Sequence, residues 1–158
     1  MKTASSRVGA LTFRQAGPED AGIVHDLIHA AYAKWVPVVG YLPRPMTVDY
    51  ARSVRDHFVE LVLHDGQAIA VLDLILEPDC LLLENIAVDP AAQGSGIGAA
   101  LMERVEQHAR ERGYSRVRLY TNRKFASNIA FYQRRGYTIE REEQLSDRVA
   151  VHMKKELP

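Results

Sequence analysis

The feature of the sequence that most constrains the fold is a glycine-rich turn between an apolar segment and a helical pattern. Gly94, Gly96 and Gly98 alternate with other residues shortly after the apolar stretch Leu81–Val88. Beyond them, apolar residues recur at the spacing of one helix face, at Ile97, Leu101, Val105 and Ala109. A strand, a tight turn and a helix in this order predict a fold in which helices pack on a sheet.

Strand and helix patterns on either side of this unit complete one domain. Asp65-Gly66 separates two apolar-rich segments and marks a hairpin. Thr47 is expected to cap a short helix, and the segment 35–45, with three prolines, is expected to be a loop. The predicted strands are 8–15, 58–64, 67–77, 81–88, 116–121, 137–143 and 148–154, and the predicted helices are 17–33, 47–55, 97–112 and 127–135. The order β-α-α-β-β-β-α-β-α-β-β predicts a three-layer α/β fold with a central mixed β-sheet flanked by helices.

Length and composition indicate a single domain, residues 1–158, of which 1–7 are expected to be flexible. The chain is 47% apolar and 25% charged, as in ordinary globular proteins. Twenty basic and twenty acidic side chains cancel, which argues against a nucleic-acid partner. The N-terminus lacks a signal region, and no apolar run approaches the ~18 residues of a membrane span. We therefore expect a cytoplasmic protein with no membrane partner.

The cysteine and the histidines give no sign of metal or disulfide chemistry. Cys80 is the only cysteine and adjoins a leucine run, which is typical of a buried structural thiol rather than a nucleophile. The six histidines are scattered without the spacing of metal ligands. We therefore expect no metal site.

The glycine-rich turn has two interpretations. It can bring several backbone N–H groups to the start of the following helix, where phosphate binds well, or it can serve tight packing alone. A P-loop is excluded because Gly98 is followed by Ala99 and Ala100 rather than Lys and Ser or Thr. A dinucleotide-binding fold is disfavoured because the next strand ends in Leu119-Tyr120-Thr121, without the carboxylate that such a fold uses.

With its flanks included, the segment resembles the GNAT superfamily of N-acetyltransferases. Gln93-Gly-Ser-Gly-Ile-Gly98, after Asn85-Ile-Ala-Val-Asp-Pro90, is similar to the family's acetyl-CoA signature Gln/Arg-x-x-Gly-x-Gly/Ala. A second family element follows at the expected distance, with Thr121-Asn122 and then Ser127 to Tyr137. The specific match covers residues 83–137, about a third of the chain. The resemblance implies a GNAT-like fold and acetyl-CoA as co-substrate.

The resemblance also implies where the coenzyme binds. Its diphosphate would lie on the amides of the glycine turn. In this family the strand that matches residues 84–88 splays from its neighbour, and the pantetheine arm would pair with the exposed backbone of Ile86 and Val88. Asn122 and Asn128 match positions that often hydrogen-bond the pantetheine, and Asn128 suits a helix start equally well. The implied cofactor-binding residues are Ile86, Ala87, Val88, Gln93, Gly94, Ser95, Gly96, Ile97, Gly98, Ala99, Asn122, Asn128 and Tyr132.

Two residues are candidate catalytic groups. Tyr132 matches the family tyrosine that protonates the departing thiolate, and it lies one helical turn after Asn128. Without that motif, core packing would be the ordinary interpretation. Glu84 interrupts an apolar strand beside the expected thioester site, which makes it a candidate base for the amine. An equal alternative is a structural carboxylate paired with an arginine such as Arg118.

The acceptor side is the least determined part of the sequence. Tyr32, Trp35, Tyr41 and Arg44 surround the proline-rich segment and are candidate pocket residues, although packing or a solvated surface explains each one alone. The resemblance implies acetyl transfer to a primary amine, on a small molecule or a peptide, by direct attack in a ternary complex. The alternatives are a non-catalytic acyl-CoA-binding regulatory module and an enzyme directed at protein lysines or N-termini. Relatives commonly dimerise, so the resemblance is compatible with a homodimer.

Overall fold

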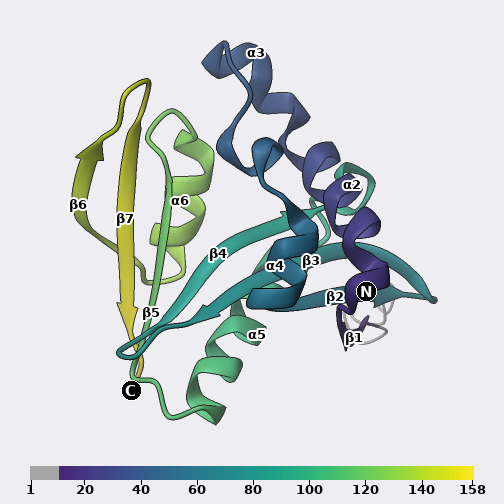
Figure 1. Ribbon diagram of the computed structural model, residues 1–158. Helices are drawn as coiled ribbons and strands as arrows, with labels where there is room; N and C mark the ends of the chain where they lie inside the picture. The colour runs from purple at the N-terminus through teal and green to yellow at the C-terminus, as the bar shows by residue number, and fades with distance from the viewer. Residues whose placement is uncertain (1–10) are drawn as a thin grey trace.

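One mixed sheet with helices on both faces forms the frame of the computed structural model, which describes residues 11–158 (Figure 1). Its strands are β1 (Leu11–Gln15), β2 (Phe58–His64), β3 (Gln67–Leu76), β4 (Leu81–Val88), β5 (Arg116–Asn122), β6 (Thr138–Gln144) and β7 (Val149–Glu156). Within the described residues these seven strands lie in the order β1-β2-β3-β4-β5-β7-β6. β4 and β5 run parallel, whereas the other neighbouring strands are antiparallel. The predicted mixed sheet is therefore confirmed.

The helices divide between the two faces of the sheet. They are α2 (Ala21–Tyr32), α3 (Val36–Val39), α4 (Tyr50–Asp56), α5 (Ile97–Glu111) and α6 (Ala126–Arg134), with short 3-10 turns η1 (Pro18–Asp20), η2 (Ala33–Trp35), η3 (Arg44–Thr47) and η4 (Pro90–Ala92). Apolar residues of α2 and α4 form one buried cluster with β2 and β3. Apolar residues of α5 and α6 form the other, with β3, β4, β5 and β7. The sheet is thus covered on both sides, as the predicted three layers require (Figure 1).

The structure differs from the sequence-based prediction in two details. The segment 35–45 is not simply a loop, because α3 and the start of η3 lie within it. Proline fits the first turn of a helix, and Pro37 and Pro45 occupy such positions, so prolines there do not exclude short helices. The cap of α4 is Asp49, whose carboxylate accepts the Ala51 N–H at 3.1 Å, and not Thr47. Residues 1–7 and the first part of the predicted strand 8–15 lie outside the described residues.

A β-bulge in the middle of β4 separates its two halves. Against β3, Leu83 pairs with Leu74 and Asn85 with Asp73, so Glu84 is an extra residue with no partner opposite. One extra residue reverses the in–out alternation of a strand. Before the bulge the odd-numbered Leu83 belongs to the α5-side cluster, whereas after it the even-numbered Ile86 packs against that cluster.

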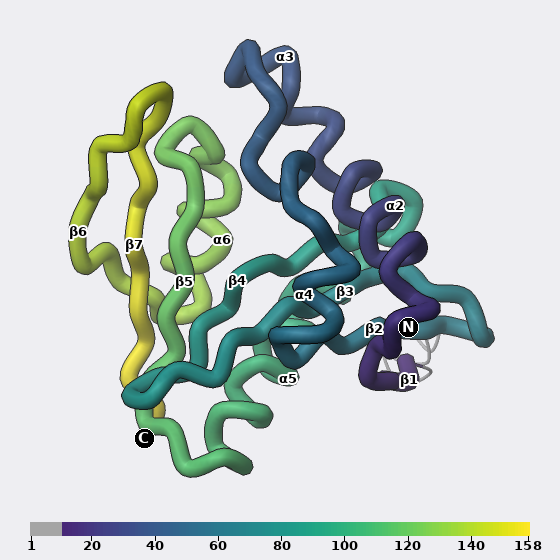
Figure 2. The backbone as a smooth tube through the Cα atoms, viewed as in Figure 1, coloured from purple at the N-terminus to yellow at the C-terminus, as the bar shows by residue number. Residues whose placement is uncertain are grey.

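The bulge coincides with the point at which β4 leaves β5. The two strands pair only from Leu81 to Leu83, opposite Val117 to Leu119. Beyond Glu84 the edge of β4 that faces β5 has no strand partner among residues 11–158. Figure 2 shows the two traces side by side at one end and diverging toward the other. The splay implied by the family resemblance is therefore present, and it opens at a carboxylate.

A buried ion-pair network anchors α5 to the sheet. Arg104 donates two hydrogen bonds to Glu60 of β2, at 3.0 and 2.7 Å, and His108 Nε2 lies 2.9 Å from Glu60 Oε1. Burial opposes ionisation of this carboxyl, but the contacts with His108 and Arg104 outweigh burial and lower the pKa of Glu60 to about 2. Since α5 begins at the glycine-rich turn, this network also fixes the position of that turn.

We predict that Glu60→Gln lowers the free energy of unfolding by about 3 kcal/mol at pH 7, because it leaves Arg104 and His108 without their buried anion. The folded-state pKa of Glu60 lies below its ordinary value of 4.5, so the carboxylate stabilises the fold above pH 4.5. That contribution is lost as the pH falls from 4.5 toward 2. Urea unfolding at pH 7 and pH 3 should show a gap between wild type and variant that narrows at the lower pH. Glu103→Gln, at an exposed position of α5, is the control, and a pH-independent gap would refute this account.

Candidate active site

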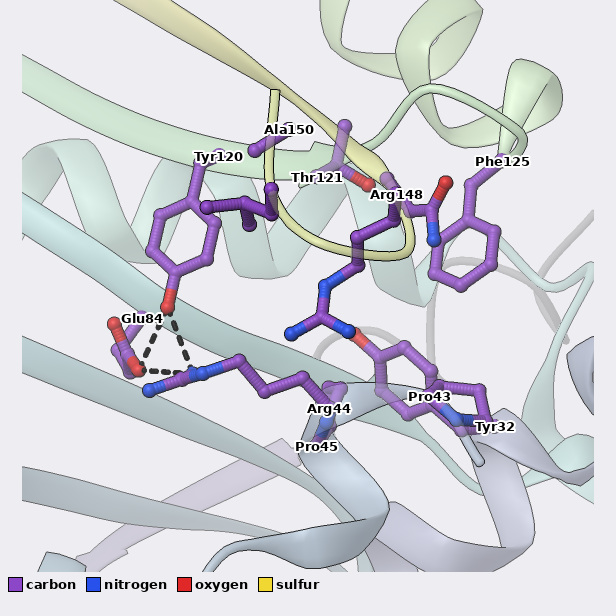
Figure 3. Close-up of a pocket in the computed structure, with 12 residues that line it drawn as sticks. Tyr32, Pro43, Arg44, Pro45, Glu84, Tyr120, Thr121, Phe125, Arg148 and Ala150 are labelled. Atoms are coloured by element: carbon purple, nitrogen blue, oxygen red, sulfur yellow. Dashed lines mark hydrogen bonds and ion pairs between the residues drawn. The ribbon is translucent and has the colours of Figure 1, made fainter. Parts of the chain in front are cut away.

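A cavity opens where β4 and β5 diverge, and one carboxylate lies on its wall (Figure 3). Its walls come from β4, β5, the end of α2, the start of η3 and the turn between β6 and β7. The lining residues are Tyr32, Pro43, Arg44, Pro45, Glu84, Tyr120, Thr121, Asn122, Phe125, Leu145, Arg148 and Ala150. Of the predicted acceptor residues, Tyr32 and Arg44 therefore line this cavity.

Glu84 is held by a triangle of hydrogen bonds with Arg44 and Tyr120. Arg44 Nη1 donates to Glu84 Oε2 at 3.0 Å and to the Tyr120 hydroxyl oxygen at 2.8 Å, and Tyr120 donates to the same Oε2 at 2.9 Å (Figure 3). The other oxygen, Oε1, accepts no hydrogen bond from any residue that the structure describes. The Glu84 carboxylate is thus oriented through one oxygen and has the other available.

The suggested pairing of Glu84 with Arg118 is wrong. Arg118 instead pairs with Glu140 at 2.9 Å and with Asp79 at 3.3 Å. The arginine that pairs with Glu84 is Arg44, which lies 40 positions earlier in the chain. Sequence spacing alone did not reveal this pair. Glu84 is nevertheless a partner for an arginine, as the structural alternative expected.

Tyr120 faces Glu84 as a hydrogen-bond donor. Burial raises the pKa of Tyr120, and the neighbouring Glu84 carboxylate raises it further by opposing a second negative charge. The phenol therefore stays protonated at neutral pH and keeps donating to Oε2.

A hydrogen-bond chain behind the cavity fixes the segment that carries Arg44. The Tyr32 hydroxyl donates to Asn85 Oδ1 at 2.9 Å, and Asn85 Nδ2 donates to the Tyr50 hydroxyl oxygen at 3.3 Å. Tyr50 in turn donates to the carbonyl of Pro45 at 2.6 Å. This chain links α2, β4 and α4 to the residue next to Arg44, so the arginine starts from a fixed backbone.

Trp35 and Tyr41 support the cavity wall without lining it. The Trp35 ring stacks on Phe125 with ring centroids 4.3 Å apart. Asn122 Nδ2 donates to the Tyr41 hydroxyl oxygen at 2.9 Å, and Asn122 Oδ1 accepts the N–H of Lys124. The predicted residues Trp35, Tyr41 and Asn122 are therefore brought together at one end of the cavity.

The glycine-rich turn leaves the backbone amides at the start of α5 without helical acceptors. Gly96 adopts a left-handed conformation (φ 82°), in which a side chain would be strained, and directly precedes the helix. The helix ladder begins with Ala100 N–H, which donates to Gly96 C=O. Ile97, Gly98 and Ala99 thus lie in the first turn, where N–H groups have no helical acceptor. A Cβ on Gly98 would lie 3.2 Å from the Phe131 ring, so this glycine permits the close approach of α6.

The remaining predicted cofactor residues follow the same path. Ile86, Ala87 and Val88 form the free end of β4, and the Gln93 side-chain amide donates to the Val88 carbonyl at 3.0 Å. Ser95 donates through its hydroxyl to the Ala92 carbonyl at 2.7 Å. The free strand edge therefore runs directly into the turn.

Tyr132 is buried on α6, with its ring packed against Phe131 and Tyr137. Burial raises the pKa of Tyr132, and the nearby Tyr32 phenol adds to the shift. The hydroxyl of Tyr132 makes no hydrogen bond within residues 11–158. Asn128, one turn earlier, is the third residue of α6, and no side chain caps this helix.

Sequence reasoning missed several lining residues. Tyr120 lies two positions before Asn122 on a strand, and that alternation could have placed both on one face of β5. Arg148 carries no comparable signal. Arg148 follows a turn whose position over the cavity depends on the pairing of β7 with β5, far from it in sequence.

The family of the chain follows from comparison with known proteins. The model of the "Acetyltransferase (GNAT) family" matches residues 24–137, more than half of the sequence. The chain therefore belongs to the GNAT acetyltransferase family, which confirms the resemblance read from its motifs.

A curated relative and two solved structures illustrate the similarity. YxbD of Bacillus subtilis (strain 168), an uncharacterized protein, is 35% identical over 94 residues, which cover 60% of this chain and 58% of YxbD. The ribosomal-protein-S18-alanine N-acetyltransferase of Escherichia coli has a TM-score of 0.75 at 21% identity, covering 93% of this chain and 94% of that one. A GNAT family acetyltransferase from Elizabethkingia anophelis, solved with acetyl-CoA bound, has a TM-score of 0.71 at 17% identity, covering 94% and 99%. The identities of 21% and 17% to the two solved structures show a common fold alone.

The chain spans about half the length of the first curated relatives it matches, 58% of one and 46% of the next. In residues 11–158, no helix has the length and apolar character needed to cross a membrane. The described part of the chain also contains no group of three or more His, Cys, Asp or Glu residues that could hold a metal ion. The domain bounds, the cytoplasmic location and the partners stay predictions.

Proposed function

We propose that the protein transfers the acetyl group of acetyl-CoA to a primary amine by direct attack within a ternary complex. The observation that carries the proposal is the divergence of β4 from β5 at Glu84, which leaves a free strand edge between the glycine turn and the cavity. An extended ligand can pair with a free strand edge through its amide groups. The pantetheine arm would bind there, beside Ile86 and Val88, with its thioester toward the cavity.

The diphosphate would bind the amides from Gly94 to Ala99. Each contact between an anion and a helix N-terminus contributes roughly 0.3–1 kcal/mol, so several donors must act together. The backbone conformation at Gly96 supports this role, because it directs the first-turn amides outward from the helix start.

Glu84 is the proposed base. A lysine-like amine with a pKa of ~10.4 is protonated at pH 7, and its deprotonation costs about 4.6 kcal/mol. The free Oε1 of Glu84 can take this proton, directly or through a water molecule, while Arg44 and Tyr120 hold Oε2. The amine nitrogen then attacks the thioester carbonyl carbon.

Tyr132 is the proposed acid. The carbon–sulfur bond breaks as the new carbon–nitrogen bond is completed, and the departing sulfur takes the phenolic proton of Tyr132. The nitrogen then loses its second proton, which returns to the Tyr132 phenolate directly or through a water molecule. The phenol of Tyr132 holds its proton at neutral pH, so the proton is present when a thiolate develops beside it. The match to the family motif, and not the raised pKa, supports the role of donor. A backbone N–H of β4 would stabilise the oxyanion formed on the carbonyl oxygen.

Tyr132→Phe should lower kcat tenfold or more and change the Kd for acetyl-CoA by less than about twofold, because it removes a proton donor without altering the packed ring. Steady-state kinetics and calorimetry measure the two quantities. Tyr137→Phe is the matched control, since that buried hydroxyl already donates to Glu106, whereas the Tyr132 hydroxyl makes no hydrogen bond within residues 11–158. An unchanged kcat in Tyr132→Phe would remove the proposed role.

Glu84→Gln should lower kcat/KM about a hundredfold at pH 7, because a missing general base costs that much or more. Tyr120→Phe removes one hydrogen bond to Oε2 and leaves Oε1 in place, so we expect a loss below about tenfold. If the two variants lost equal activity, Glu84 would be a structural partner of Arg44 only.

A further inference from the structure

A second arginine, Arg148, reaches into the cavity from the turn between β6 and β7 (Figure 3). Its side chain is 24% exposed, and Nη1 donates to Asp147 Oδ1 at 2.9 Å. The Asp147 side chain is itself 50% exposed, and exposed ion pairs contribute little. Neither Nε nor Nη2 of Arg148 meets an acceptor among the residues that the structure describes. The guanidinium therefore has donors left for a ligand.

The backbone around Arg148 is fixed from several directions. Leu145 N–H donates to the Arg148 carbonyl at 2.8 Å and closes the turn. The Gln144 side-chain amide donates to the carbonyls of Leu145 and Arg148, at 2.7 and 3.3 Å. On the far side, Arg123 N–H donates to the Val149 carbonyl at 2.9 Å, which ties the turn to the end of β5. A side chain that starts from a fixed turn loses less entropy on binding than one on a mobile loop.

The charged residues that line the cavity are two arginines and one glutamate, so they leave one positive charge. Arg44 and Glu84 neutralise each other within their hydrogen-bonded triangle. Arg148 is then the remaining charged group among the lining residues. The rest of the wall is largely aromatic or apolar, with Tyr32, Phe125 and Leu145 among its members. Such a wall suits an apolar ligand that carries one negative group.

We propose that Arg148 forms an anion subsite for the acceptor, which is an amine that also carries a carboxylate, as an amino acid does. The inference rests on the proposed function, because it takes the cavity for the acceptor site. A guanidinium binds a carboxylate with two parallel hydrogen bonds, which fixes orientation as well as charge. With the carboxylate on Arg148, the apolar body packs on the aromatic wall and the amine faces Glu84. The same positive charge repels polycationic acceptors.

The test compares a matched pair of acceptors, phenylalanine and 2-phenylethylamine, which differ by the carboxylate. For wild type we expect kcat/KM to be about tenfold to a hundredfold higher for phenylalanine, the range of a charge-assisted hydrogen bond. In Arg148→Gln this ratio should fall close to one, and in Arg148→Lys it should be intermediate, because lysine keeps the charge without the planar fork. A ratio at or below one in wild type, or the same ratio in Arg148→Gln, would overturn the inference.

The matched control is Arg123→Gln, which removes the same charge from an arginine that pairs with Glu142 at 3.1 Å and lies outside the cavity lining. This variant should keep the wild-type ratio, and an equal collapse here would mean a long-range charge effect rather than a subsite. β-Alanine and O-phosphoethanolamine form a second pair, in which an Arg148-dependent preference for the phosphate would overturn the carboxylate assignment.

A binding measurement separates failure of the inference from failure of the proposed function. Phenylalanine is titrated into wild type, Arg148→Gln and Arg123→Gln, each saturated with free coenzyme A, and calorimetry gives the Kd. Weaker binding confined to Arg148→Gln supports the subsite even if no amine is acetylated, an outcome that would overturn the proposed function alone. Equal binding by the three proteins would overturn the subsite even if acetylation proceeds.

Discussion

One extra residue in a β-strand determines the geometry of the whole site. Because Glu84 has no partner opposite it on β3, β4 reverses its alternation there and stops pairing with β5. The same bulge therefore presents a carboxylate to the cavity and frees the strand edge behind it. Bulges are common next to active sites, where they redirect a side chain or end a pairing. Here a single bulge does both.

The two faces of the sheet bring different parts of the site to this point. The face covered by α5 and α6 supplies the glycine turn, its free amides and Tyr132. The face covered by α2 and α4 supplies Arg44 and the hydrogen-bond chain from Tyr32 through Asn85. Acetyl-CoA would thus place its thioester in the opened sheet from one side, and the acceptor amine would reach it from the other. Direct attack in a ternary complex requires such an arrangement.

Local patterns predicted the fold, whereas the contacts inside the cavity join segments that lie far apart in the sequence. Order of elements, the glycine turn and the segment Leu81–Val88 follow from periodicity and turn chemistry, which act over a few residues. The sequence indicates Arg44 as a pocket residue, but its pairing with Glu84 joins positions 40 apart, and Arg118 was the example that the sequence offered for a structural partner. Arg148 reaches the cavity through the pairing of β7 with β5, so no local pattern could mark it.

Calorimetric titration with acetyl-CoA tests the claim that the opened strand and the glycine turn bind a coenzyme A thioester. Wild type and Gly22→Ala should bind one equivalent, because a Cβ on Gly22 meets nothing within 4 Å. Gly96→Ala should bind about tenfold more weakly, since alanine strains the left-handed conformation (φ 82°) and displaces several amides worth roughly 0.3–1 kcal/mol each. No heat of association with wild type, or equal affinity in all three proteins, would contradict the claim.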